Sequence, residues 1–95
     1  MMNVDDSVID IIRQSALMYN VDKIILFGSR AKGNGNDRSD YDLLVFGGDY
    51  YGFCDYMDED ANTLDRFDIS NGNNAGVDFL DEIMKYGVVI YEKAD

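Results

Sequence analysis

The sequence predicts a single α/β domain in which helices pack on a small β-sheet. Helical and strand-like hydrophobic patterns alternate along the chain. The 95 residues, of which 46% are hydrophobic, are enough for one modest core. No repeat, linker or low-complexity segment divides the chain, so we expect one domain over residues 1–95.

The first half of the chain predicts one helix and two strands. Apolar residues recur at helical spacing over residues 6–19, and polar side chains at residues 5–7 can cap the start. KIILFG at 23–28 and YDLLVFGG at 41–48 are short apolar runs ended by glycine. Such runs are typical of buried strands.

A second helix and a third strand are predicted next. Residues 53–64 place four apolar side chains on one helical stripe, namely Phe53, Met57, Ala61 and Leu64. RFDIS at 66–70 is typical of a strand. The single cysteine, Cys54, excludes an internal disulfide and has no basic neighbour to activate it. We interpret it as a small buried hydrophobic residue.

The chain ends with a loop, a helix and a strand in this prediction. NGNNAG at 71–76 is typical of a loop, and apolar spacing from Val77 predicts a last helix. Gly87 is suited to a left-handed position that closes this helix. VVIYEK at 88–93 then predicts a terminal strand.

Composition limits the chemistry that the protein can perform. There is no histidine, which excludes a Ser/His nucleophile pair and an imidazole zinc site. Acid–base and metal chemistry therefore fall to carboxylates, which favour hard cations such as Mg²⁺. No signal peptide and no membrane-spanning apolar segment is present, so we expect a cytoplasmic protein without membrane partners.

The charge is unevenly distributed. Nineteen acidic and eight basic residues give a net charge of -11, which disfavours direct binding to a nucleic-acid polymer. Three of the basic residues nevertheless gather within residues 28–39, namely Arg30, Lys32 and Arg38. The local charge therefore favours a small anion.

Gly28 and Ser29 follow a predicted strand and precede a short predicted helix. Backbone N–H groups at such a turn can hold a phosphate, and the serine hydroxyl adds a donor. For these two residues alone, a strand-end glycine followed by a serine helix cap is the favoured interpretation. Other phosphate loops do not fit, because the segment lacks both a GK[ST] ending and the third glycine of a dinucleotide fingerprint.

Three aspartates complete the candidate site. Asp40 and Asp42 are two positions apart at the head of a strand, so their side chains leave the same face and can clamp Mg²⁺. A solvated loop entering the strand is the alternative. Asp68 lies in the third predicted strand, either buried with a partner or exposed on an edge strand. If the two strands are neighbours, three carboxylates meet, as in a two-metal phosphoryl or nucleotidyl transfer site.

The motifs resemble the minimal nucleotidyltransferases of the DNA polymerase β superfamily. ILFGSRAKG and RSDYDLLV match the core of the family, RFDIS its third-acid strand and FLDEIMKYGVVIYEK its usual ending. The resemblance implies an α+β nucleotidyltransferase fold with a small mixed sheet. It implies Mg²⁺ (two ions) at Asp40, Asp42 and Asp68, with Asp68 helping to deprotonate the acceptor.

The same resemblance implies a substrate and a partner. ATP is the implied donor, and Gly28 and Ser29 would hold its terminal phosphates, whereas Arg30 and Lys32 face either phosphate or solvent. Minimal members are paired with a small helical HEPN-type toxin, and some are antitoxins that transfer AMP to a tyrosine of that toxin in a hetero-oligomer. A non-catalytic module that neutralises its partner by binding is the alternative, and a polymerase-type enzyme acting on nucleic acid is weaker.

Overall fold

A single mixed sheet forms the centre of the protein. The computed structural model describes residues 4–36 and 39–94, and in these ranges the sheet has four strands in the order β3-β2-β1-β4. The strands are β1 (Lys23–Phe27), β2 (Tyr41–Phe46), β3 (Phe67–Asn71) and β4 (Val88–Glu92). β1 is antiparallel to β2 and β4, whereas β2 and β3 are parallel. The predicted α/β class and small mixed sheet are confirmed.

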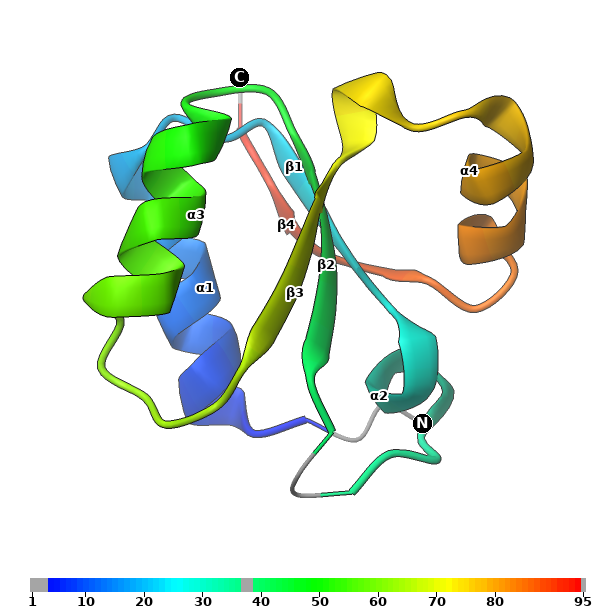
Figure 1. The fold of residues 1–95 in the computed structure, drawn as a ribbon, viewed down its shortest axis with the longest axis horizontal. Coiled ribbons are helices and arrows are strands. Elements are labelled where there is room, and N and C mark those ends of the chain that lie inside the picture. The colour runs from blue at the N-terminus through cyan, green and yellow to red at the C-terminus, as the bar shows by residue number, and fades with distance from the viewer. Residues whose placement is uncertain (1–3, 37–38, 95) are drawn as a thin grey trace.

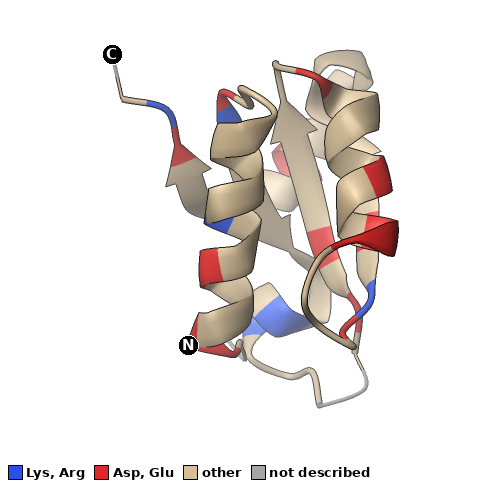
Figure 2. Ribbon diagram, turned by 90° about the vertical axis from the view of Figure 1, so that its left-hand side faces the viewer, with Lys and Arg blue, Asp and Glu red and all other residues tan. Residues whose placement is uncertain are grey.

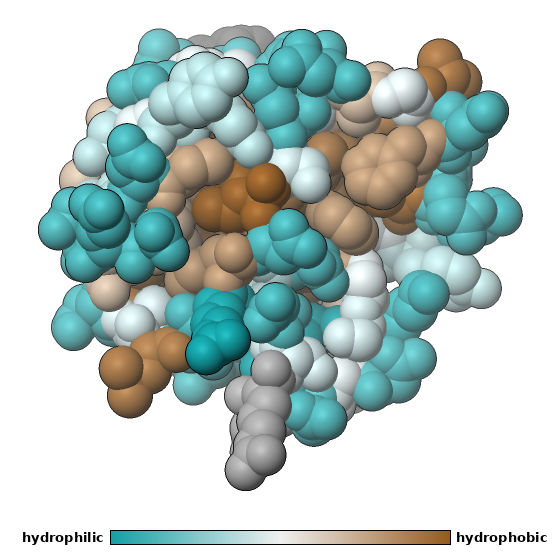
Figure 3. All heavy atoms as spheres, viewed as in Figure 1, coloured by the Kyte–Doolittle hydropathy of each residue, from teal (hydrophilic) through white to brown (hydrophobic). Residues whose placement is uncertain are grey.

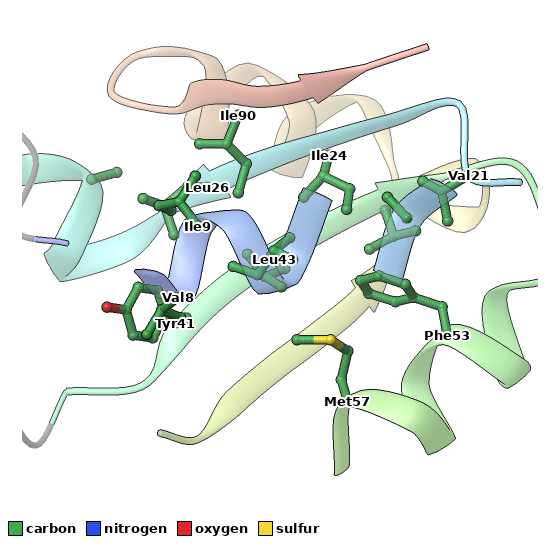
Figure 4. Close-up of a cluster of buried hydrophobic side chains, with 14 residues drawn as sticks. Val8, Ile9, Val21, Ile24, Leu26, Tyr41, Leu43, Phe53, Met57 and Ile90 are labelled. Atoms are coloured by element: carbon green, nitrogen blue, oxygen red, sulfur yellow. The ribbon is translucent and has the colours of Figure 1, made fainter. Parts of the chain in front are cut away.

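Two helices, α1 (Asp6–Met18) and α3 (Tyr50–Glu59), cover one face of the sheet (Figure 1). The Asp5 side chain caps α1 by accepting a hydrogen bond from the Ser7 amide at 2.9 Å. Apolar side chains from both helices and the sheet form the main core (Figure 4), which includes Val8, Ile9, Ile12, Val21, Ile24, Leu26, Leu43, Phe53 and Met57. Among the described helices, none has the length and apolar character needed to cross a membrane.

The opposite face is only partly covered. The short helix α4 (Val77–Met84) packs there, where its Ile83 joins Ile25 and Leu44 in a second, smaller core. α2 (Gly28–Lys32) follows β1 directly and lies near the opposite end of the sheet from α3's first turn (Figure 1). Asp42 is half-buried and Asp68 is exposed, so this face remains open at their position.

The second helix starts and ends earlier than predicted. We expected residues 53–64, but α3 begins at Tyr50 because the Asp49 side chain accepts a hydrogen bond from the Gly52 amide at 3.1 Å. It ends at Glu59, in an acidic run that the negative end of the helix dipole disfavours. Leu64 is consequently fully exposed at 102%, although its spacing matched the apolar stripe. Cys54 is half-buried and not fully buried as predicted.

Gly87 follows the last helix but does not adopt the left-handed conformation that we expected. The φ angle of Gly87 is not positive, and the C-cap of α4 is Lys85, whose backbone is in the right-handed helical region. A side chain at Gly87 would approach the Ile83 carbonyl oxygen within 2.8 Å and the Ile25 side chain within 2.9 Å. The glycine is therefore required for close packing between α4 and β1. The loop predicted at 71–76 contains a one-turn 3₁₀ helix, Gly72–Asn74.

Candidate nucleotidyl transfer site

Asp42 and Asp68 lie side by side on the open face of the sheet. They are register partners in the parallel pair β2–β3, so their side chains leave the same face. Tyr41 and Leu43, on either side of Asp42, point into the main core on the other face. The two strands are neighbours, which is the condition that the sequence analysis set for bringing the carboxylates together. β3 is an edge strand, and Asp68 is exposed on it, which matches the second of the two interpretations.

Gly28, the first residue of the Gly-Ser motif, lies next to the Asp42 carboxylate. Its φ of +73° lies in the left-handed region, which side chains rarely adopt. A Cβ atom at this position would lie 2.1 Å from Asp42 Oδ2. The backbone of Gly28 therefore lies directly against the Asp42 carboxylate, since Phe27, the preceding residue, is the cross-strand partner of Asp42. The two motifs therefore meet, although a spacer, residues 30–39, separates them in the sequence.

The three aspartates share one region of negative potential. Burial is the main cause that raises the pKa of the Asp42 carboxyl, and the charges of Asp68 and Asp40 raise it further. Asp40 is exposed and lies immediately before β2. A positive charge beside Asp42 would therefore stabilise its ionised form.

The donor set fits a hard divalent cation in its chemistry. Carboxylate oxygens are the ligands that Mg²⁺ prefers, and the raised pKa of Asp42 marks a position where a cation is favoured. Within residues 4–36 and 39–94, however, no three acidic or thiol ligands are arranged closely enough to hold a metal ion. Repulsion among like-charged carboxylates favours such a spread arrangement. A metal site formed by Asp40, Asp42 and Asp68 stays a prediction.

Ser29 lies inside the first turn of α2. The N-cap position of this helix is occupied by Phe27, and no side chain caps it, so Ser29 is not the helix cap of the alternative interpretation. Ser29 is half-buried, and its carbonyl oxygen accepts a hydrogen bond from the Asn34 amide at 3.1 Å. Its predicted contact with phosphate stays a prediction.

Arg30 is buried, with 4% of its surface exposed. Its Nε donates a hydrogen bond to the Ser39 carbonyl oxygen at 2.9 Å, and a terminal nitrogen lies 4.0 Å from Asp65 Oδ1. Its guanidinium carbon is 4.1 Å from the centroid of the Tyr41 ring. These contacts tie α2 to the segment that precedes β2, so Arg30 helps to position Asp40 and Asp42. A phosphate contact of Arg30 stays a prediction.

The other two basic residues of the spacer differ from Arg30. Lys32 is exposed at the end of α2, with its Nζ 5.1 Å from the centroid of the Tyr86 ring. A role of Lys32 in nucleotide binding also stays a prediction. Arg38 lies outside the described residues.

Sequence reasoning missed the residues that support this site. Asp65 and Tyr41 are the partners of Arg30, and no motif or spacing relates them to residue 30 in the sequence. The sequence shows only that a basic residue, Arg30, follows a predicted phosphate-binding turn. That position is compatible with a side chain that points into the protein or into solvent. The distinction depends on how the spacer folds back.

Comparison with known proteins identifies the family. The family model "Polymerase beta, Nucleotidyltransferase" matches residues 7–95, whereas no curated protein matches the chain. The fold is similar to that of a toxin–antitoxin crystal structure with AMP-PNP, with a TM-score of 0.71, 16% identity, and coverage of 90% of this chain and 73% of that one. It is also similar to a mutant of the MntA–HpeT toxin–antitoxin, with a TM-score of 0.67, 17% identity, and coverage of 93% and 73%. Because the family model spans nearly the whole chain, the protein belongs to the polymerase β nucleotidyltransferase family.

Proposed function

We propose that this protein transfers AMP from ATP to a tyrosine hydroxyl of a small all-helical HEPN-type toxin, and so acts as its antitoxin. Family membership gives nucleotidyl transfer as the general reaction. The donor and the partner are supported by the two similar folds, which belong to toxin–antitoxin structures, one of them with AMP-PNP. The observation that carries the proposal is the contact of Gly28 with Asp42, whose register partner is Asp68.

Each motif has a separate task in the proposed reaction. The amides of Gly28 and Ser29 and the Ser29 hydroxyl bind the terminal phosphates. Asp40, Asp42 and Asp68 hold Mg²⁺, which when bound neutralises charge on the triphosphate and favours the ionised acceptor. A side chain at Gly28 would separate the phosphates from Asp42, so the glycine brings the two tasks together.

The bonds that change are those at the α-phosphorus of ATP. The acceptor oxygen forms a bond to this phosphorus, and the bond to the oxygen that bridges to the β-phosphate breaks. Pyrophosphate leaves with the electron pair of that bond. The proton of the acceptor hydroxyl passes to the Asp68 carboxylate, which is exposed and returns it to water.

The test is transfer of label from ATP labelled at the α-phosphate, with the protein encoded beside this gene as candidate acceptor. We expect label on the acceptor with the parent protein and with Asp81→Asn, a matched charge change on the exposed side of α4. Asp42→Asn is expected to abolish transfer and remain folded. Labelling by Asp42→Asn at the rate of Asp81→Asn would contradict the proposal.

Neutralisation of the toxin is measured separately, because a binding module could neutralise without chemistry. If the double variant Asp40→Asn, Asp42→Asn protects cells from the partner as fully as the parent does, the antitoxin acts by binding alone. A neighbouring gene for a short helical protein with an Arg-x4-6-His pattern supports the proposed partner. Its absence from the neighbourhood weakens that part of the proposal.

A further inference from the structure

A groove with an apolar floor runs along the outer edge of β3, on the side that faces α3. It has a volume of about 650 Å³, and α3, β3 and the connection between them form its walls. Figure 3 shows apolar surface in this region between hydrophilic borders. No motif of the nucleotidyl transfer site includes residues 60–65 of this connection. We call this feature the edge groove; its lining includes Asp40, Met57, Asp58, Leu64, Phe67 and Ile69.

The floor of the edge groove is apolar and held in place. Phe67 and Ile69 lie on the same side of β3 and pack partly against the main core. The Tyr50 hydroxyl donates a hydrogen bond to the Ile69 carbonyl oxygen at 3.1 Å, which fixes α3 to β3. Burial beside Cys54 raises the pKa of Tyr50 to about 12, so this hydroxyl remains a donor at neutral pH. Leu64 at the rim is fully exposed.

The walls of the edge groove are acidic. Asp40, Asp55, Asp58 and Asp65 line it, against one basic residue, Arg66. Asp65 faces Arg30 at 4.0 Å, whereas Asp55 and Asp58 are exposed along α3. Figure 2 shows this acidic side at the end of α3 and in the connection that follows. A second copy of this chain, also at a net charge of -11, would be repelled from it.

The edge groove and the Asp42–Asp68 pair lie on opposite faces of the sheet at the edge strand β3. Asp68 alternates with Phe67 and Ile69 along β3, so its side chain leaves the other face. Asp40 lines the edge groove and also contributes charge at Asp42. Because β3 has no further strand beyond it, a bound segment can pass around its edge from one side to the other.

We propose that the edge groove docks the acceptor, namely a segment of a partner protein that carries Lys or Arg beside an apolar side chain. The apolar side chain occupies the floor, the basic side chains pair with Asp55 and Asp58, and the adjacent hydroxyl reaches around β3 to Asp68. This proposal rests on the proposed function, since it assigns the acceptor side of that reaction.

The probes are two peptides of ten residues that each contain one tyrosine and one leucine. In the first, the remaining positions alternate Lys, Arg and Ser; in the second, Glu replaces every basic residue. NMR chemical shifts of the backbone amides, measured on isotopically labelled protein at low ionic strength, show where each peptide binds. We expect the basic peptide to shift residues 54–58 and 63–69 and the acidic peptide to shift none of them. Equal binding of both peptides, or shifts confined to other surfaces, would overturn the proposal.

Two variants of the edge groove and one control measure how much its charges and its apolar surface contribute to peptide binding. Asp55→Asn with Asp58→Asn removes two charges and is expected to weaken basic-peptide binding about three- to tenfold, as for exposed charge pairs. Leu64→Ser removes exposed apolar surface and is expected to weaken it as well. Asp10→Asn with Asp81→Asn removes the same charge from α1 and α4 and controls for net charge. Equal weakening by the groove and control pairs would show that docking there is not specific.

The same peptides distinguish docking from chemistry when labelled ATP is added. If the basic peptide binds in the edge groove and ATP binds, but no label is transferred, the proposed reaction fails and the docking surface stands. If label reaches the tyrosine equally in the parent and both groove variants, the docking proposal fails and the reaction stands.

Discussion

Replacement of Gly28 by alanine tests the link between the two motifs. The backbone φ of +73° costs a non-glycine residue about 1–2 kcal/mol. Alanine recovers about 0.4–1 kcal/mol by restricting the unfolded chain. The new Cβ also lies 2.1 Å from Asp42 Oδ2, so the carboxylate must move. We expect a net loss of about 1–2 kcal/mol in the free energy of unfolding, which is a fall of roughly 4–16 °C in Tm for a domain of this size.

Activity is expected to fall further than stability in this variant. Displacement of a reacting group by about 1 Å can cost roughly 100-fold in rate, so label transfer should fall by about that factor in protein that is still folded. Gly76→Ala is the control, because nothing lies within 4 Å of a Cβ there and its φ is -73°. Urea unfolding and initial transfer rates measure both effects. If Gly28→Ala matched Gly76→Ala in both measurements, the assigned contact between Gly28 and Asp42 would be wrong.

Three further predictions concern Asp42, Arg30 and Cys54. The pKa of Asp42 in the folded protein is raised above the ordinary value of 3.8, so its ionised form destabilises the fold; this destabilisation is absent below pH 3.8 and appears as pH rises through the raised pKa. Asp42→Asn should therefore be more stable than the parent at pH 7 and as stable as the parent below pH 3.8. A loss of stability at pH 7 would show that Asp42 has a structural role. Arg30→Ala should lower the free energy of unfolding by about 1–3 kcal/mol in urea titrations, because the bond to Ser39 and the contact with Tyr41 are lost. Arg30→Lys should recover little of it, since a lysine lacks the planar group, and full recovery would refute the geometry. Burial raises the pKa of the Cys54 thiol, so iodoacetamide should alkylate it more slowly at pH 7.5 than in unfolded protein, and equal rates would count against its half-buried position.

The sequence predicted those parts of the fold that depend on local pattern. Strands β1, β2 and β4 coincide with apolar runs that a glycine precedes or follows. The sequence left open whether the strands of Asp42 and Asp68 are neighbours, and the parallel pairing of β2 with β3 answers this. The predicted end of the second helix was wrong because Leu64 continues the apolar period by chance. α3 ends at Glu59, where the acidic residues oppose the negative end of the helix dipole. The apolar pattern alone does not show that these effects end the helix before Leu64.

The unpredicted parts depend on how distant segments pack. Arg30 is buried because Tyr41 and Asp65, which are distant in sequence, meet its guanidinium. Gly87 is required by its approach to Ile25 and not by its backbone angle. The edge groove likewise arises from α3 and β3 together, so no local pattern in the sequence predicted it.

The position of the label within ATP tests the central claim most directly. The acceptor is incubated with the protein and Mg²⁺, with ATP labelled in parallel reactions at the α-phosphate and at the γ-phosphate. A site in which Asp42 and Asp68 serve nucleotidyl transfer should leave the α-label on the acceptor and release the γ-label in pyrophosphate. Retention of the γ-label on the acceptor, or release of that label as orthophosphate without transfer of the α-label, would contradict it.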